Sequence, residues 1–218
     1  MMLAEPEYLT EINLKLKEMQ EAIRNIGSAV QSALLNRQKG TSASICAMSQ
    51  TIHRIDEEIT DKCVEALIRH QPFAGDLRNI TVALKISYDL ARVGRYLYNV
   101  TQIIDDVGGE DCEVGEISSM LEEARDMIDQ SMNGYFKKDY ALAENMTYRD
   151  DKIDERYRQV LSKYKEMKNV KGECIMLNAL VARIVERMAD HACYISNESL
   201  YLITGKRQTI RAPKCNER

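Results

Sequence analysis

The sequence predicts an all-helical protein, and three features of its composition lead to that prediction. The 218 residues contain only three prolines (Pro6, Pro72 and Pro213), so residues 7 to 212 hold a single helix breaker. The ten glycines are too few and too clustered to supply the turns that a sheet protein of this length needs. Aromatic and β-branched runs, which favour strands, are sparse. These features exclude β-sandwich, β-barrel and doubly wound α/β folds.

The first two predicted helices fill the N-terminal third of the chain. The first covers residues 7–36 and stops just before Gly40. The second starts at Thr41 or Ser42, either of which can cap a helix N-terminus, and continues to His70. Helices of 25–30 residues are about 40 Å long, so each must lie against its neighbours along its whole length.

The third predicted helix begins after Pro72 and ends at Gly108-Gly109, with Asp76 in its first turn. Its apolar residues recur in steps of three and four, which is typical of a helix face that is buried against neighbouring helices. These residues are Leu90, Val93, Leu97, Val100, Ile104 and Val107.

Three further helices are predicted after the two glycines. The fourth covers Glu116 to Gly134, and the fifth runs from Asp139 to Met167. The sixth starts after Gly172 and ends at Gly205, because glycine is favoured at helix C-termini. The inward-facing residues of the fifth are Met146, Ile153, Tyr157, Val160 and Tyr164. Six long helices with short connections predict antiparallel bundles.

The two halves of the chain resemble each other, which indicates a duplicated three-helix unit. The segment RIDEEIT around Asp56 is followed 94 residues later by RDDKID around Asp150, and DLARVGRYLYN is followed 95 residues later by IVERMADHACY. We therefore predict two tandem three-helix bundles, residues 1–108 and 109–205, followed by a basic tail, 206–218. Contact of this tail with anionic lipid or a partner is one interpretation, and a solvated tail is the other.

Charge and cysteine content restrict the cellular setting. The formal charge of −4 argues against a nucleic-acid binder, no stretch of about 18 apolar residues predicts a membrane span, and the N-terminus lacks a secretory pattern. The six cysteines form no CxxC pair, so we expect reduced thiols in a cytoplasmic protein; zinc or disulfides are the alternatives. They are Cys46, Cys63, Cys112, Cys174, Cys193 and Cys215.

Two acidic pairs are the strongest candidates for chemistry. Glu186 and Asp190 lie four residues apart on the sixth helix, opposite its apolar stripe and beside small residues rather than lysines. Asp150 and Asp154 have the same spacing on the fifth helix. Oxygen ligands so placed can converge on a metal ion, whereas the alternative is an ordinary solvated face.

Motifs of enzyme chemistry are absent from the sequence. There is no GxGxxG, Walker, GxSxG or HExxH motif, and no histidine follows a glutamate by three residues as di-iron bundles require. His191 falls on the apolar stripe of the sixth helix, where we expect a buried, hydrogen-bonded histidine. The sequence therefore predicts a protein that is not an enzyme.

Three segments resemble a known family. HQPFAGDLR (70–78) resembles the QQP-x-A-x-DLR segment of PhoU-type phosphate-uptake regulators. ALKISYDLARVGRYLYNV (83–100) and RIVERMADHACYISNESLYLITG (183–205) resemble the AL-x-I-x-x-DLERIGD and LERIADHA helices of that family. The resemblance covers essentially the whole chain, including its length and its duplication.

This resemblance implies a cytoplasmic, often dimeric, non-enzymatic regulator built from two three-helix bundles. Such proteins restrain high-affinity phosphate uptake and are associated with a phosphate ABC transporter, through its ATPase, and in many bacteria with a sensor histidine kinase. Membrane association would then come only through partners. The alternatives are a carboxylate-metal bundle, for metal storage or metal-dependent hydrolysis, and a purely structural helical scaffold.

The resemblance also implies a metal site, because several family members bind multinuclear metal clusters through E-x-x-x-D motifs, one cluster in each repeat. In the second repeat, Glu186 and Asp190 preserve that motif, and Asp150 with Asp154 preserves the partnering acidic pair. We therefore expect these four carboxylates to hold divalent or trivalent metal ions.

The first repeat departs from the motif. Ala91 and Arg95 stand where the family has glutamate and aspartate, and Thr60 replaces the second acid of the earlier pair, which leaves only Asp56. A divalent metal would lack ligands and be repelled there, so we predict a degenerate site. Arg95 is expected to replace the charge of the metal by pairing with Asp56 or Asp89.

Overall fold

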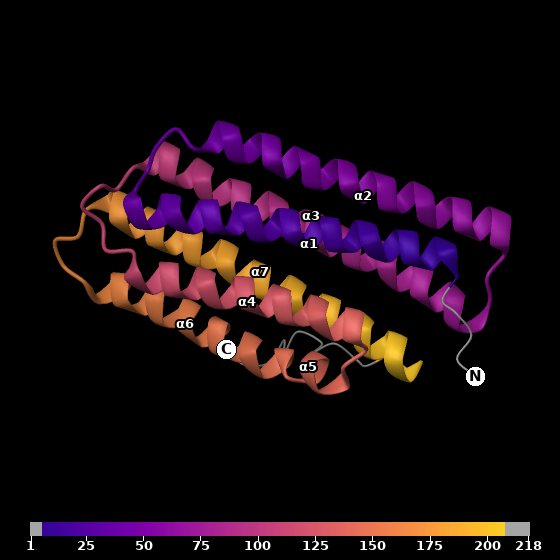
Figure 1. Ribbon diagram of the computed structural model, residues 1–218. Helices are drawn as coiled ribbons and strands as arrows, with labels where there is room; N and C mark the ends of the chain where they lie inside the picture. Colours follow the sequence, from indigo (N-terminus) through magenta and orange to yellow (C-terminus); the bar gives the residue numbers. More distant parts are fainter. Residues whose placement is uncertain (1–5, 208–218) are drawn as a thin grey trace.

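The computed structural model describes residues 6–207 and is all-helical within that range, as predicted (Figure 1). Six long helices and one short helix run roughly parallel or antiparallel to one another. They are α1 (Glu7–Asn36), α2 (Ser42–His70), α3 (Ala74–Val107), α4 (Gly115–Lys137), the short α5 (Tyr140–Glu144), α6 (Met146–Glu166) and α7 (Gly172–Thr204). None of these helices is both long enough and apolar enough to cross a membrane.

The single helix predicted over residues 139–167 is in fact two helices. The side chain of Asp139 accepts a hydrogen bond from the backbone N–H of Leu142 at 3.2 Å and caps the short α5. Asn145 separates α5 from α6. The break allows α5 to pack on both α4 and α7 with Ala143 buried, a tertiary contact that helical periodicity alone does not reveal.

The helices form two three-helix groups that share one hydrophobic core. α1, α2 and α3 pack on one another, as do α4, α6 and α7, and the two groups occupy the upper and lower halves of Figure 1. Buried residues from both groups belong to one continuous cluster, because α7 packs along α3 as well as along α4 and α6. The domain boundary at residue 109 stays a prediction.

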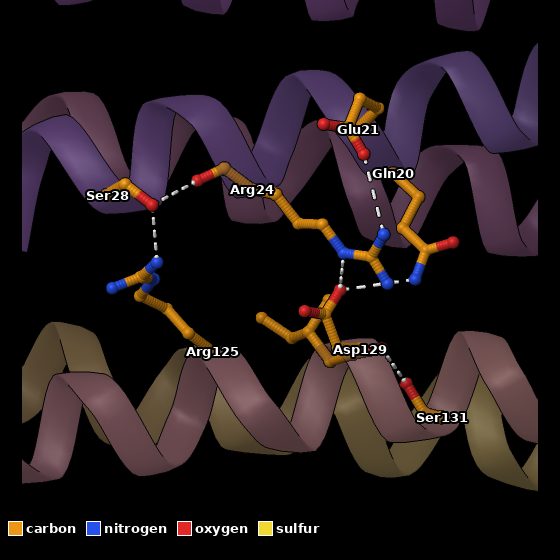
Figure 2. Close-up of polar contacts among 8 residues, drawn as sticks. Gln20, Glu21, Arg24, Ser28, Arg125, Asp129 and Ser131 are labelled. Carbon is orange, nitrogen blue, oxygen red and sulfur yellow. Dashed lines mark hydrogen bonds and ion pairs between the residues drawn. The ribbon is translucent and has the colours of Figure 1, made fainter.

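Polar contacts join the two groups between α1 and α4 (Figure 2). Asp129 accepts hydrogen bonds from Arg24 at 2.7 Å and from Gln20 at 3.1 Å. Arg125 donates to the hydroxyl of Ser28 at 2.8 Å, and burial lowers the pKa of this arginine. These directional bonds fix the register of the two helices, which apolar packing alone specifies less tightly.

A second polar contact between the groups is buried between α3 and α7. His191 Nδ1 lies 2.8 Å from Asp89 Oδ1, and both side chains are about 10% exposed, at 11% and 10%. Burial raises the pKa of the Asp89 carboxyl although the nearby imidazole acts in the opposite direction. Lys85 forms a neighbouring ion pair with Glu198 at 2.7 Å. The expectation of a buried, hydrogen-bonded His191 is confirmed.

The expectation of reduced thiols is wrong for Cys112 and Cys174, which form a disulfide across 62 residues. Cys112 lies in the connection between α3 and α4, and this connection lies against the first turn of α7, which carries Cys174. No local pattern in the sequence reveals that meeting. Three other cysteines are free thiols: Cys46, Cys63 and Cys193.

Only the start of the basic tail falls within the described residues. Arg207 pairs with Glu198 at 2.9 Å and lies 4.1 Å from the centre of the Tyr201 ring. The contact of the tail with lipid or a partner concerns residues 208–218, and these, with Cys215, lie outside the described residues.

Candidate functional site

The four acids of the second repeat lie at the contact between two packed helices. Asp150 and Asp154 are on α6, and Glu186 and Asp190 are on α7. All four side chains are partly buried. The i, i+4 spacing places each pair on one face of its helix, and the packing of α6 on α7 brings the two pairs together. The structure therefore assembles all four residues of the candidate set.

The carboxylates raise one another's pKa. Burial, followed by repulsion from Asp190 and Asp154, raises the pKa of Asp150 from 3.8 to about 7. Burial raises the pKa of Glu186, with Asp190 as the next cause, and it raises the pKa of Asp190, with Asp154 as the next cause. This mutual repulsion shows that the four groups share one environment, in which the local cations compensate their charge only partly.

Two oxygens of this acidic cluster are buried without a hydrogen-bond partner: Oδ1 of Asp150 and Oε2 of Glu186. The other oxygen of Glu186 accepts from Arg183 at 2.6 Å, and Asp154 pairs with Arg158 at 3.8 Å. A buried carboxylate oxygen without a partner is costly, and a bound cation would satisfy it. The donor set therefore fits a hard, oxygen-preferring metal ion.

The spacing of the carboxylates argues against a single metal ion that is coordinated by three of them. Within the described part of the chain, the one set of three candidate ligand atoms within 4.8 Å of one another is Cys112, Glu173 and Cys174. The two sulfurs of that set are bonded to each other and are therefore not thiolate ligands. No three of the acids on α6 and α7 meet that spacing, so they do not form a ready-made site for one ion with three of them as ligands.

Two neighbours of the acidic cluster were missed as functional candidates. Asp151 contributes to the raised pKa of Asp150, and the buried thiol of Cys193 has its pKa raised by burial and by Asp150 and Asp190. Adjacency in sequence was the available signal for Asp151. For Cys193, the signal was its place on the small-residue face of the sixth predicted helix.

The degenerate site of the first repeat lies between α2 and α3. Asp56, Ala91 and Arg95 line one cavity there, whereas Thr60 is exposed and is not among the residues that line it. The structure thus brings three of the four positions together. It places one acid and one cation where the second repeat has four acids.

The expected partner of Arg95 was wrong. Asp89 pairs with His191 instead, and no ion pair joins Arg95 to Asp56 in the range 6–207. The guanidinium of Arg95 lies 5.7 Å from the centre of the Tyr98 ring. Asp89 points to α7 rather than to the α2–α3 cavity because the two residues, six positions apart, lie on different faces of α3.

The raised pKa of Asp150 predicts how stability depends on pH after treatment with a chelator. The unfolded carboxyl has a pKa near 3.8 and the folded one about 7, so the folded state binds more protons between these values. Stability should therefore rise as pH falls from 7.5 to 5. After discounting for solvent screening, we expect about 1 kcal/mol from this group, or about 2–4 °C in Tm.

Thermal melts of the wild-type chain and of Asp150→Asn, at several pH values, isolate that contribution. Asp56→Asn is the matched control, because Asp56 is the equivalent residue of the first repeat. We expect Asp150→Asn to flatten the pH dependence more than the control does. Equal slopes for all three proteins would show that Asp150 does not titrate in this range.

Comparison with known families matches both halves of the chain. The model of the PhoU domain matches residues 16–104 and 117–199. A Synechocystis protein named phosphate-specific transport system accessory protein PhoU homolog is 30% identical over 205 residues, which cover 88% of this chain and 91% of that protein. A Clostridium acetobutylicum protein of the same name is 28% identical and covers 88% and 93%.

Solved structures show the same fold. The crystal structure of PhoU from Pseudomonas aeruginosa superposes with a TM-score of 0.84 at 22% identity and covers 91% of this chain and 98% of that one. The phosphate transport system regulatory protein PhoU from Streptococcus pneumoniae also gives 0.84, at 17% identity, and covers 93% and 98%.

Proposed function

Because the chain belongs to the PhoU family, we propose that it is a non-enzymatic regulator of phosphate uptake. It would act as an adaptor on the cytoplasmic side of a phosphate ABC transporter, through the transporter ATPase, its sensor histidine kinase, or both. The observation that carries this proposal is the match of both repeats to the family, over nearly the full length of relatives that are named as accessory proteins of phosphate transport. A homodimer stays part of the proposal.

We further propose that the second repeat holds the metal. Asp150 and Asp154 from α6, with Glu186 and Asp190 from α7, would supply the oxygen ligands. The two partnerless buried oxygens and the raised pKa of Asp150 support this assignment, since both indicate carboxyl groups that their protein neighbours compensate only partly. Bound cations would lower the repulsion between α6 and α7 and stiffen this end of the second repeat.

Metal-dependent hydrolysis is the second candidate, and one observation favours it. The four partly buried carboxylates on α6 and α7 could hold a metal ion that activates a water molecule, as such hydrolases require. Phosphatase assays of the metal-loaded chain and of Glu186→Gln separate the two functions. Turnover that is lost in the variant would favour the enzyme, whereas bound metal without turnover favours the regulator.

Co-purification from native membranes tests the regulatory role. The tagged chain is recovered from cells grown in high and in low phosphate, and its partners are identified by mass spectrometry, with untagged cells as the control. We expect a phosphate-transporter ATPase or its sensor kinase to be enriched. Enrichment of an unrelated transporter would preserve the fold but overturn the proposed substrate.

A further inference from the structure

The first-repeat cavity has a volume of about 340 Å³, within the roughly 300–1,000 Å³ range of small-molecule sites. It opens between α2 and α3. In Figure 1, α2 lies at the opposite side of the bundle from α6. Ala91 lies in its wall at the position that Glu186 occupies 95 residues later. The cavity therefore occupies the place where a longer carboxylate side chain would project.

Two guanidinium groups give this cavity a positive character. Arg92 and Arg95 both line it and are exposed, and neither forms an ion pair within the described residues. Arg92 donates to the hydroxyl of Tyr96 at 3.2 Å, and Arg95 lies against the ring of Tyr98. These contacts orient the cations but leave their charge uncompensated. Asp56 is the one acid among the described residues that line the cavity.

Aromatic faces lie beside the cations. Tyr88, which is 58% exposed, and Tyr98 both line the cavity. An exposed tyrosine ring offers a flat apolar face on which a planar ring can stack, and guanidinium forks bind phosphate oxygens in pairs. The equivalents of these two tyrosines in the second repeat are Arg183 and Cys193, so neither tyrosine is repeated at its equivalent position.

We propose that the α2–α3 cavity binds a nucleoside phosphate, with Arg92 and Arg95 on the phosphate and the exposed ring of Tyr88 against the base. A divalent cation would meet two positive side chains and a single carboxylate there, so the cavity selects against metal. Inorganic phosphate would bind the arginines but would have no ring to stack on the tyrosines. The proposal does not depend on metal binding by the second repeat or on the transporter partner.

Calorimetry on the full chain, after treatment with a chelator, tests the ligand class. AMP and UMP are compared with adenosine, uridine and inorganic phosphate at equal ionic strength. We expect at least one nucleotide to bind at least about tenfold more tightly than phosphate and than its own nucleoside, a difference of about 1.4 kcal/mol or more. Phosphate that binds as tightly as both nucleotides, or no measurable nucleotide binding, would overturn the proposal.

Three single variants locate the contacts. Arg95→Ala should weaken nucleotide binding at least about tenfold, because it removes one charged fork. Tyr88→Ala should weaken the nucleotide but not inorganic phosphate. Arg69→Ala is the matched control, since Arg69 is an exposed arginine of α2 that lies outside the cavity and pairs with Glu65. An equal loss in this control would indicate non-specific attraction and overturn the assignment.

Cys46 provides a readout at the site itself. This free thiol lines the cavity and is partly exposed, whereas the free thiols of Cys63 and Cys193 are buried. Saturating nucleotide should slow alkylation of Cys46 by N-ethylmaleimide, measured by peptide mass spectrometry. An unchanged rate in the presence of calorimetrically bound nucleotide would place the ligand elsewhere and contradict the proposal.

Discussion

Replacing His191 by alanine is expected to lower the free energy of unfolding by about 3–5 kcal/mol, because it leaves a buried carboxylate without its partner. The Asp89 side chain is 10% exposed and lies 2.8 Å from the His191 ring. The pair lies between α3 and α7, so its loss weakens the contact that unites the two repeats. The loss of stability is large because the buried Asp89 carboxyl is left without a hydrogen-bond partner, in addition to the loss of the bond itself.

Urea denaturation at pH 7.5 measures this effect through the midpoint and the slope. His53→Ala is the matched control: His53 is 71% exposed in its side chain, and we expect a change within about 0.5 kcal/mol. The double variant Asp89→Ala/His191→Ala removes both polar groups and should be more stable than His191→Ala alone. If it is instead less stable by the full sum of the single losses, the coupling between the two residues is absent.

Loss of the Cys112–Cys174 disulfide should cost about 4 kcal/mol if its main effect is on the entropy of the unfolded chain, as estimated for a loop closed across 62 residues. The bond ties the connection before α4 to the first turn of α7, so the unfolded second repeat is constrained most. Reducing compartments keep such pairs as thiols, and the stability of the reduced chain is therefore the one relevant to a cytoplasmic location.

Denaturation of the oxidised chain, the reduced chain and Cys112→Ser/Cys174→Ser measures this cost. Cys46→Ser controls for the loss of a thiol that is not bonded. We expect the reduced chain and the double variant to unfold at lower urea concentration than the oxidised chain and the control. Equal midpoints for the oxidised and reduced chains would show that the bond contributes nothing to stability.

The helices were predictable because their signals are local. The breakers and the steps of three and four residues placed five of the six long helices within a few residues of their observed bounds. The short α5 was not predictable, because no proline or glycine marks the break at Asn145. The break instead accompanies the packing of α5 against α4 and α7. The Cys112–Cys174 bond was also not predictable, because it depends on how the connection between α3 and α4 packs against the first turn of α7.

The acidic cluster was predictable because two i, i+4 pairs and a repeat offset are both visible in the sequence. The partner of Arg95 was not predictable, because the sequence positions of opposite charges do not reveal which helix faces pack against each other. Asp89 turns to His191 on α7, and Arg95 turns to Tyr98 within its own helix. The cavity beside Arg95 required both helices in place before its volume and its uncompensated cations became visible.

Metal content is the most direct test of the claim that the two repeats have diverged, one retaining an acidic metal site and the other having lost it. Elemental analysis of the untagged chain, of Asp190→Asn and of Asp56→Asn compares the two repeats at similar positions. We expect metal in the wild-type chain and in Asp56→Asn, and a fall of at least about tenfold in Asp190→Asn, because a direct ligand is lost. Metal content unchanged in Asp190→Asn, or lost only in Asp56→Asn, would contradict the assignment of the site to the second repeat.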